Sequence, residues 1–335
     1  MAPATPGSIP LGIREITIEN FRGIPLLELK LLDAAQQTSD TFVLAGPNGS
    51  GKTAILEACL LALGHPNLLR GPSGPWAVRS GATGYRIAVQ IQTTDGIQER
   101  AVIAESKSTR RNPRSKQHTS DEPVPCRYFS SWRAPQLVGA VPITAGGVIP
   151  RTPEKEWNRI LLFKQYLVNA KAHASMRQQS MPEGATVFDT VVGRLDEVWR
   201  LFHPGREQSF HVEPVGEDPS SGFDVYLAGP RQPRVPLDSL SSGELELVAL
   251  FGDFLRLDFP EGVLLIDEPE LHLDPQWHGL MLRALRRFLP AVQLIVATHS
   301  PEVFDSVYSF QRHLLVPPGD PRGIAWKARP SGVAG

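Results

Sequence analysis

The chain has 335 residues, 41% of them hydrophobic and 21% charged, which is typical of globular proteins and excludes fibrous and disordered classes. Its 34 basic and 35 acidic side chains nearly cancel, which excludes a global attraction to nucleic acid or to an anionic membrane. Two cysteines cannot form a disulfide scaffold, the N-terminus lacks a signal peptide pattern, and no apolar run reaches the roughly 18 residues of a membrane helix, so we expect a cytoplasmic protein without membrane insertion.

The first predicted elements are a β-hairpin and then a strand, a loop and a helix. Apolar residues alternate over 13–18 and 26–31, on either side of a turn at 20–23. A short apolar strand at 41–45 leads through a glycine-rich loop into an amphipathic helix over 54–63. This order of elements is the one in which a phosphate-binding loop is found.

The glycine-rich loop matches the complete P-loop pattern G-x-x-x-x-G-K-[ST]. Glycines allow backbone N–H groups to converge on phosphate oxygens at a helix N-terminus. Lys52 is predicted to reach the β- and γ-phosphates of ATP, and Thr53 is predicted to hold Mg²⁺. The predicted nucleotide-binding residues of the loop are Gly46, Pro47, Asn48, Gly49, Ser50, Gly51, Lys52 and Thr53.

The middle of the chain reads as a hairpin, a basic loop and two helices. Alternation from Tyr85 to Ala104 around an Asp-Gly turn predicts an antiparallel addition to the main sheet. Residues 106–123 are basic and offer nothing apolar to bury, which predicts a mobile loop. Apolar residues at i, i+3 and i+4 then predict helices within 157–168 and 188–202.

The C-terminal third alternates helices with strands. The pattern predicts a helix from 237, strands at 263–266 and 292–296, and helices at 275–289 and from about 301. Such alternation implies a parallel sheet covered on both faces. The fold class expected is α/β, a P-loop NTPase with a mixed, mainly parallel sheet flanked by helices, an antiparallel β subdomain and a helical insertion.

Polar residues follow these strands where catalysis by a P-loop protein requires them. Asp267 is predicted to enter the magnesium shell, and Glu268 to polarise an attacking water. Paired carboxylates seldom serve packing, because each is costly when buried unpaired. His299 ends the next strand and is predicted to hydrogen-bond the γ-phosphate or the water. The segment 240–244, Leu-Ser-Ser-Gly-Glu, places hydroxyls and amides at a helix N-terminus, although by itself it is a capped helix start.

This ordered set of motifs resembles the ATPase head of the ABC superfamily. Residues 18–24, 240–244 and 267–274 resemble the corresponding segments of RecF/SMC-like and overcoming-lysogeny-defect (OLD) ATPases. The resemblance covers most of the chain outside 106–205. The middle is too short for the long coiled coil of SMC-like proteins, and the segment after His299 leaves no room for the TOPRIM nuclease of full-length OLD proteins.

The resemblance implies an ATP-dependent, head-to-tail homodimer. In such a dimer Ser241, Ser242 and Gly243 of one subunit touch the γ-phosphate that the P-loop of the other subunit holds. Asp274 would lie near the dimer axis as the D-loop residue. Arg22 matches the Asn-Phe-Arg segment that lies beside the nucleotide in the family, although an ordinary surface arginine is the alternative.

The resemblance also sets an expected domain organisation. We expect one ABC-type domain with three parts: an N-terminal lobe at 11–105, an insertion at 106–205 and a C-terminal lobe at 206–335. The glutamine of the Q-loop is missing directly after the strand, so Gln136 or Arg133 is predicted to replace it.

The expected reaction is ATP hydrolysis, for which the sequence leaves three roles open. The first is a sensor or regulatory subunit of bacterial anti-phage defence that works with a separate effector chain. The second is a RecF-like DNA clamp whose basic segment, Lys107 to Lys116, meets DNA phosphates. The third is the ATPase head of a transporter, which the motifs at 18–24 and 240–244 disfavour.

Overall fold

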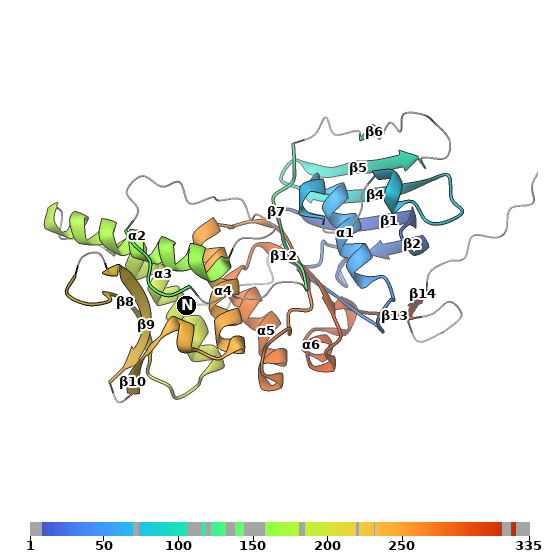
Figure 1. Ribbon diagram of the computed structural model, residues 1–335. Helices are drawn as coiled ribbons and strands as arrows, with labels where there is room; N and C mark the ends of the chain where they lie inside the picture. Colours follow the sequence, from blue (N-terminus) through green and yellow to red (C-terminus); the bar gives the residue numbers. More distant parts are fainter. Residues whose placement is uncertain are drawn as a thin grey trace, which may run out of the picture. The chain divides into compact units, whose positions relative to one another are not determined.

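The computed structural model describes residues 9–69, 74–105, 116–117, 122–131, 138–143, 158–180, 185–218, 221–230, 232–316 and 323–325 (Figure 1). The chain divides into two compact units. The first unit consists of Met1–Trp132, Pro260–Leu271 and His278–Gly335. The second unit consists of Arg133–Phe259 and His272–Trp277. The organisation of 1–335 as one ABC-type domain in three parts stays a prediction.

The first unit contains a six-stranded sheet in the order β14-β13-β3-β12-β11-β7, and every pair of neighbours is parallel. The central strands β3, β12 and β11 are buried along their whole length, as apolar strands of a parallel sheet are when both faces are covered. The strands are β3 (Thr41–Ala45), β7 (Cys126–Phe129), β11 (Gly262–Asp267), β12 (Val292–Thr298), β13 (Arg312–Val316) and β14 (Ile324–Ala325).

The second sheet of this unit is antiparallel and has the order β2-β1-β4-β5-β6. The hairpin predicted as an addition to the main sheet belongs to this separate sheet, so that expectation is wrong. The reason is that β4 pairs with β1 along its length, with Ile16 opposite Val89 and Ile18 opposite Ile87. The strands are β1 (Gly12–Phe21), β2 (Ile24–Lys30), β4 (Gly84–Thr93), β5 (Gly96–Glu105) and β6 (Lys116–Gln117).

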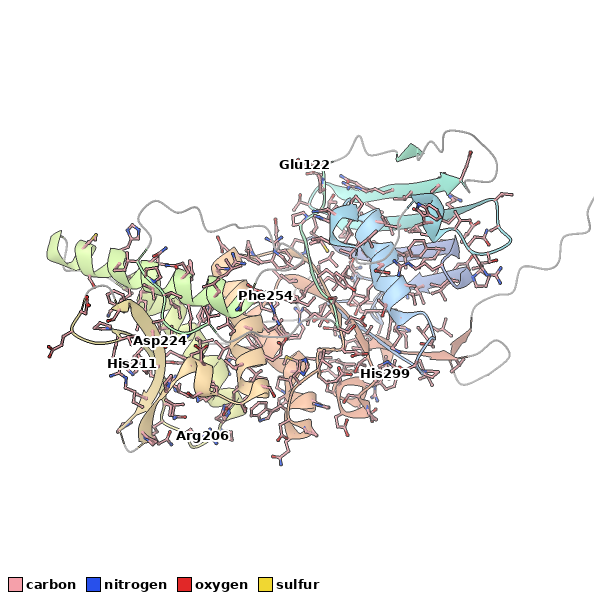
Figure 2. The ribbon with its side chains drawn as sticks, viewed as in Figure 1. Glu122, Arg206, His211, Asp224, Phe254 and His299 are labelled. Atoms are coloured by element: carbon pink, nitrogen blue, oxygen red, sulfur yellow. The ribbon has the colours of Figure 1, made fainter. Side chains whose placement is uncertain are left out.

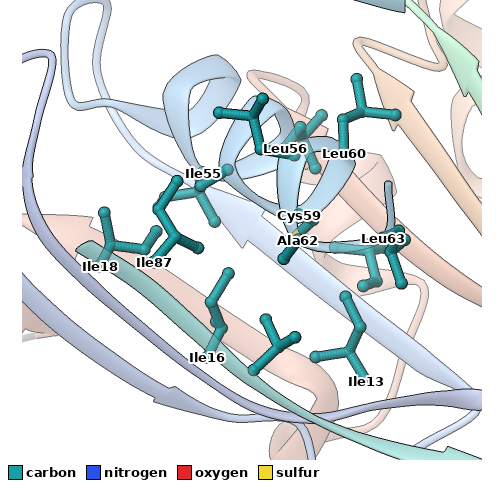
Figure 3. Close-up of a cluster of buried hydrophobic side chains, with 14 of the residues drawn as sticks. Ile13, Ile16, Ile18, Ile55, Leu56, Cys59, Leu60, Ala62, Leu63 and Ile87 are labelled. Carbon is teal, nitrogen blue, oxygen red and sulfur yellow. The ribbon is translucent and has the colours of Figure 1, made fainter. Parts of the chain in front are cut away.

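Helix α1 (Lys52–Ala62) joins the two sheets through one hydrophobic core. Figure 3 shows Ile55 and Cys59 of α1 on the side that faces Ile16, Ile18 and Ile87 of the antiparallel sheet. All five side chains are at most 1% exposed. Burying a side chain of this size contributes about 1.5–3 kcal/mol, so the core holds the P-loop helix firmly against both sheets.

Gln293 is a buried polar link between the same two sheets. Its side chain, on β12, accepts a hydrogen bond from Ile13 N at 2.7 Å and donates to Ile13 O at 2.8 Å and to Ser39 O at 3.0 Å. A Cβ atom at Gly12 would lie 3.0 Å from the Gln293 carboxamide, so glycine gives this side chain its room. The start of β1 is thereby fixed to the parallel sheet with every polar atom of the contact paired.

The remaining helices of the chain match the predicted order. Beyond α1 they are α2 (Arg159–Ser180), α3 (Val187–Phe202), α4 (Ser242–Leu257), α5 (Pro275–Phe288) and α6 (Pro301–Asp305). Among the described residues, the 3-10 helices are η1 (Pro66–Leu68), η2 (Gly74–Ala77), η5 (Leu237–Ser239) and η6 (Ser309–Gln311). Within the described ranges no helix is both long enough and apolar enough to cross a membrane.

The second unit packs α2, α3 and α4 with a three-stranded antiparallel sheet in the order β10-β9-β8. A Cβ atom at Gly252 of α4 would lie 2.6 Å from the Phe163 ring of α2, so the absence of a side chain lets these helices approach closely. Thr186 and Asp189 form a capping box that starts α3. The strands, β8 (Ser209–Pro214), β9 (Phe223–Gly229) and β10 (Gln232–Pro236), were not predicted.

Lys164 of α2 is fully buried, and its ammonium group joins three segments of the second unit. Its Nζ donates to Asp224 Oδ1 on β9 at 2.6 Å, to Asp238 Oδ2 in η5 at 2.8 Å and to Gly139 O at 3.0 Å (Figure 2 labels Asp224). An ammonium group has three N–H donors, so this one is saturated. Because η5 directly precedes the segment 240–244, the ion cluster anchors the approach to that segment.

Replacing Lys164 by methionine is expected to lower the free energy of unfolding by about 3–5 kcal/mol, because it leaves the buried Asp224 and the partly buried Asp238 carboxylates around an apolar side chain. Lys171→Met, on the exposed face of the same helix, is the matched control and should cost less than about 1 kcal/mol. Urea denaturation followed by circular dichroism measures both values. Equal midpoints for the two variants would contradict a structural role for the cluster.

Candidate functional site

The P-loop lies between β3 and α1, as the sequence predicts, and its glycines are required by the local backbone. Gly51 caps α1 with φ of 93°, in the left-handed region that favours glycine. At Gly46 a Cβ atom would lie 2.7 Å from Leu315 O of β13, so a larger residue would displace the neighbouring strand. The loop therefore holds its backbone in a conformation that few other sequences could adopt.

Lys52 is almost completely buried within this loop. Its Nζ donates to Gly46 O at 2.8 Å and to Pro47 O at 3.1 Å. Burial lowers the pKa of Lys52 from its ordinary value, while the nearby carboxylates of Asp267 and Glu268 act in the opposite direction. The ammonium group is thus placed between the phosphate-binding backbone and the acidic end of β11.

Thr53 and Asp267 meet directly, although they are 214 positions apart in the sequence. Thr53 Oγ1 donates to Asp267 Oδ2 at 2.8 Å. Asp267, the last residue of β11, is 2% exposed. A hydroxyl and a carboxylate oxygen are hard ligands of the kind that Mg²⁺ takes together with substrate phosphates, so the residues present fit the expected ion.

Glu268 and His299 directly follow the neighbouring strands β11 and β12, and their side chains point to one another. His299 Nε2 lies 3.5 Å from Glu268 Oε1, and about a third of each side chain is exposed. Figure 2 labels His299 on the segment that follows β12. Glu268 has φ of 54°, a left-handed conformation that costs a residue with a side chain about 1–2 kcal/mol, and its N–H donates to Ala297 O at 2.7 Å. Backbone strain of this kind is concentrated at functional sites.

These residues line one cleft of about 440 Å³ in the first unit. Arg22 also lines it and forms an ion pair with Glu57 of α1, whose side chain is buried. The cleft is lined by Arg22, Gly23, Ile24, Asn48, Gly49, Gly51, Lys52, Thr53, Ala54, Asp267, Glu268 and His299. The structure thus brings together the P-loop, the acidic pair, the histidine and the arginine that the sequence singled out.

The segment 240–244 lies in the second unit, at the start of α4. Ser241 caps the helix, and its N–H and Oγ both donate to Glu244 Oε2 at 2.9 Å. Ser242 begins α4. Gly243 is buried, and a Cβ atom there would lie 2.8 Å from His272 O. Glycine is therefore needed where the helix start meets the segment after the acidic motif.

Glu244 is the most strongly perturbed acidic group of that helix start. A hydrogen bond with the His203 side chain, 3.2 Å away, lowers the pKa of Glu244 to about 2, and the Ser241 amide and hydroxyl add to the effect. Arg206 Nη1 also contacts its Oε1 at 3.3 Å. The ring of His203 stacks on Trp199 at a centroid distance of 3.9 Å, which fixes it at the end of α3.

Asp274 is also in the second unit. Its Oδ1 accepts a hydrogen bond from Gln276 N at 2.9 Å, and its carbonyl accepts one from Trp277 N at 2.8 Å, as at the start of a helix. Arg133 and Gln136, the candidates for the Q-loop, lie outside the described residues, as does most of the expected basic loop.

Sequence reasoning missed two acidic residues that contact the predicted site. Glu57 pairs with Arg22, and Glu270 accepts hydrogen bonds from the segment that carries His299. Glu57 follows Thr53 by one helical turn, and Glu270 follows Glu268 by two residues. Their spacing within the two motifs was visible, but their partners come from distant parts of the chain.

Two family models match the chain. Residues 147–305 match "AAA domain, putative AbiEii toxin, Type IV TA system", and residues 15–124 match "AAA domain". The structure of an Smc head domain with an extended coiled coil, bound to the C-terminal domain of ScpA and derived from Pyrococcus furiosus, has a TM-score of 0.50 at 14% identity. That match covers 89% of this chain and 92% of the Smc chain, and it shows a common fold.

Curated relatives match shorter stretches. A retron Vc95 probable ATPase from Vibrio cholerae serotype O1 biovar El Tor is 38% identical over 93 residues, 24% of this chain and 18% of that protein. A retron Ec83 probable ATPase from Escherichia coli is 36% identical over 144 residues, 36% and 25% of the two chains. Septu protein PtuA from Bacillus thuringiensis is 49% identical over 43 residues, which are 13% of this chain and 11% of that protein. The matched stretches span a quarter or less of these relatives.

The parallel sheet with its P-loop at the end of β3 has the fold of a P-loop NTPase. The order of the motifs, the AAA-domain matches over both halves and the fold shared with an Smc head agree with the predicted resemblance to ABC-type ATPase heads. The α/β fold class predicted from the sequence is confirmed.

Gly243→Ala is expected to lower the free energy of unfolding by about 1–3 kcal/mol, because its Cβ would overlap the carbonyl of His272. Gly193→Ala is the matched control, since a Cβ at that exposed helical position meets nothing within 4 Å. The control should stabilise by up to about 1 kcal/mol through helix propensity. Opposite shifts in the urea midpoint support the close contact at Gly243, and a stabilised Gly243→Ala would contradict it.

The depressed pKa of Glu244 predicts a dependence of stability on acid. Since the pKa falls on folding from 4.5 to about 2, the stabilisation is complete above pH 4.5 and is lost as the pH falls towards 2. The amount involved is about 3 kcal/mol. Urea titrations at several pH values should show a smaller acid-dependent loss in Glu244→Gln, while Glu217→Gln, at an exposed position of the same unit, should follow the wild type. If the unfolding free energy of Glu244→Gln depends on pH as strongly as that of the wild type, Glu244 is not the origin of the acid dependence.

Proposed function

We propose that this protein binds ATP with Mg²⁺ in the cleft of the first unit and hydrolyses it. The observation that carries the proposal is the hydrogen bond of 2.8 Å between Thr53 Oγ1 and Asp267 Oδ2. It joins the end of the phosphate-binding loop to the end of the acidic strand in one place. Mg²⁺ held by these two oxygens would neutralise charge on the β- and γ-phosphates.

The residues around this pair have the roles that hydrolysis requires. Glu268 is the general base that orients and deprotonates the attacking water, and its Oε1 lies within reach of the His299 ring. His299 senses the γ-phosphate from the same sheet edge. Lys52 supplies a positive charge where negative charge is transferred to the leaving group, and its side chain is largely buried, which makes electrostatic interactions strong. Arg22 contributes a second cation at the rim.

The second half of the active site is proposed to come from another copy of the chain. Ser241, Ser242 and Gly243 present hydroxyls and amides at the N-terminus of α4, where the helix dipole favours an anion. In a head-to-tail dimer these groups would bind the γ-phosphate held by the P-loop of the partner, and Asp274 would lie near the dimer axis. ATP would then hold the dimer together, and hydrolysis would release it.

The likeness to retron probable ATPases and to Septu protein PtuA supports a biological role for this cycle. We assign the chain as the sensor or regulatory ATPase of an anti-phage defence system. In this role the nucleotide state of the dimer controls a separate effector chain. A co-purifying effector from the native host, bound only in the presence of ATP, is the expected observation.

Glu268→Gln is expected to keep ATP binding, to lower kcat for hydrolysis by about 10²–10⁴-fold and to accumulate as a dimer in ATP. Lys52→Ala is expected to lose ATP binding, because no other ammonium group lies in the loop. Glu261→Gln, at the exposed entry to the strand that ends at Asp267, is the matched control with wild-type behaviour. Phosphate release, calorimetry and light scattering after gel filtration measure the three properties. Glu268→Gln protein that stays monomeric in saturating ATP would refute the composite site.

A further inference from the structure

Glu270 makes an unusual set of contacts with the segment that carries His299. Its Oε1 accepts three hydrogen bonds, from Thr298 Oγ1 at 2.7 Å, from His299 N at 2.9 Å and from Ser300 N at 3.1 Å. The donors come from three successive residues. One carboxylate oxygen therefore fixes the peptide groups on both sides of His299.

The same turn also carries the proposed general base. Glu268 and Glu270 are separated by one residue, and Leu271 N donates to Glu268 O at 3.0 Å, which closes the turn. Glu268 itself is tied to the neighbouring strand through its bond to Ala297 O. Because one short turn supports both the base and the histidine loop, the distance of 3.5 Å between the Glu268 and His299 side chains depends on Glu270.

A purely stabilising role does not account for the carboxylate. Glu270 Oε2 is a buried atom without a hydrogen-bond partner among the described residues. An unpaired buried carboxylate oxygen costs free energy, so the side chain is a poor choice for stability alone. Costly polar arrangements that persist beside reacting groups are typical of sites where geometry is under selection.

We propose that Glu270 is a positioning residue, which acts on ATP hydrolysis by holding His299 against Glu268. The inference rests on the proposed function, since it concerns the rate of the same reaction. Glu270 does not need to touch ATP or the attacking water. Its effect passes through the backbone of Thr298, His299 and Ser300.

The expected effect is on turnover and not on nucleotide affinity. A displacement of a catalytic group by about 1 Å can lower the rate about 100-fold. Glu270→Ala removes the shared acceptor of the three donors, of which only Ser300 N keeps another, Thr298 Oγ1 at 2.9 Å. We therefore expect kcat to fall about 10- to 100-fold while KM for ATP stays within about threefold. Glu270→Gln retains a carbonyl acceptor and should recover most of the lost turnover.

Steady-state ATP hydrolysis by the full chain tests the proposal, with Glu302→Ala as the matched control. Glu302 is also a carboxylate that touches this segment, and it accepts a hydrogen bond from Ser300 Oγ. The hydrogen bonds from the Thr298 hydroxyl and from the His299 and Ser300 amides go to Glu270 instead. Its variant should keep kcat within about twofold. Equal losses in Glu270→Ala and Glu302→Ala would overturn the specific role of Glu270.

A double-mutant cycle with His299→Ala tests whether Glu270 acts through the histidine. If it does, Glu270→Ala adds little to His299→Ala, and the double variant loses no more than about twofold further turnover. Multiplied losses in the double variant would overturn the proposal, because Glu270 would then act independently of His299.

Two further outcomes separate this inference from the proposed function. A wild-type chain that hydrolyses no ATP, alone or with its partner, overturns the proposed function and this inference with it. An active wild type with an equally active Glu270→Ala overturns this inference alone. Should Glu270→Ala fail to fold, Thr298→Val removes one of the three donors at nearly constant volume. It should lower kcat several-fold, and unchanged turnover would refute the role.

Discussion

The hydrogen-bond register of three parallel strands determines which residues meet at the candidate cleft. Strands β3, β12 and β11 are neighbours, with Ala45 opposite Thr298 and Ala297 opposite Asp267. Because parallel strands end at the same edge, the P-loop, the histidine and the acidic pair must emerge side by side. Residues that are far apart in the sequence meet there without any long loop to carry them, and a shift in register would separate all of them at once.

That edge concentrates features which oppose stability. The left-handed Glu268, the buried ammonium group of Lys52 and the unpaired Oε2 of Glu270 each cost free energy. The strands beneath them are apolar and buried throughout, and the core around α1 extends into the antiparallel sheet. The rigid apolar layer is therefore what permits strained and charged groups to persist at its rim.

Local patterns explain which features could be predicted from the sequence. The P-loop, the order of strands and helices and the positions of Asp267, Glu268 and His299 all depend on motifs or periodicities within about ten residues. The separate antiparallel sheet and β8–β10 depend on which strands pair, which alternation alone does not specify. The same limit applies to Glu57 and Glu270, whose partners lie in distant segments.

The start of α4 shows the same dependence on distant residues. Its approach is anchored by Lys164 of α2 through Asp238, and Glu244, which pairs with the capping residue Ser241, is held by His203 at the end of α3. The capped serine motif is therefore presented by both helices, through charged contacts that are directional and sensitive to displacement. A short motif that is generic in sequence thus acquires a defined geometry from distant side chains. His203 lies 41 positions from Glu244, and Lys164 lies 74 positions from Asp238.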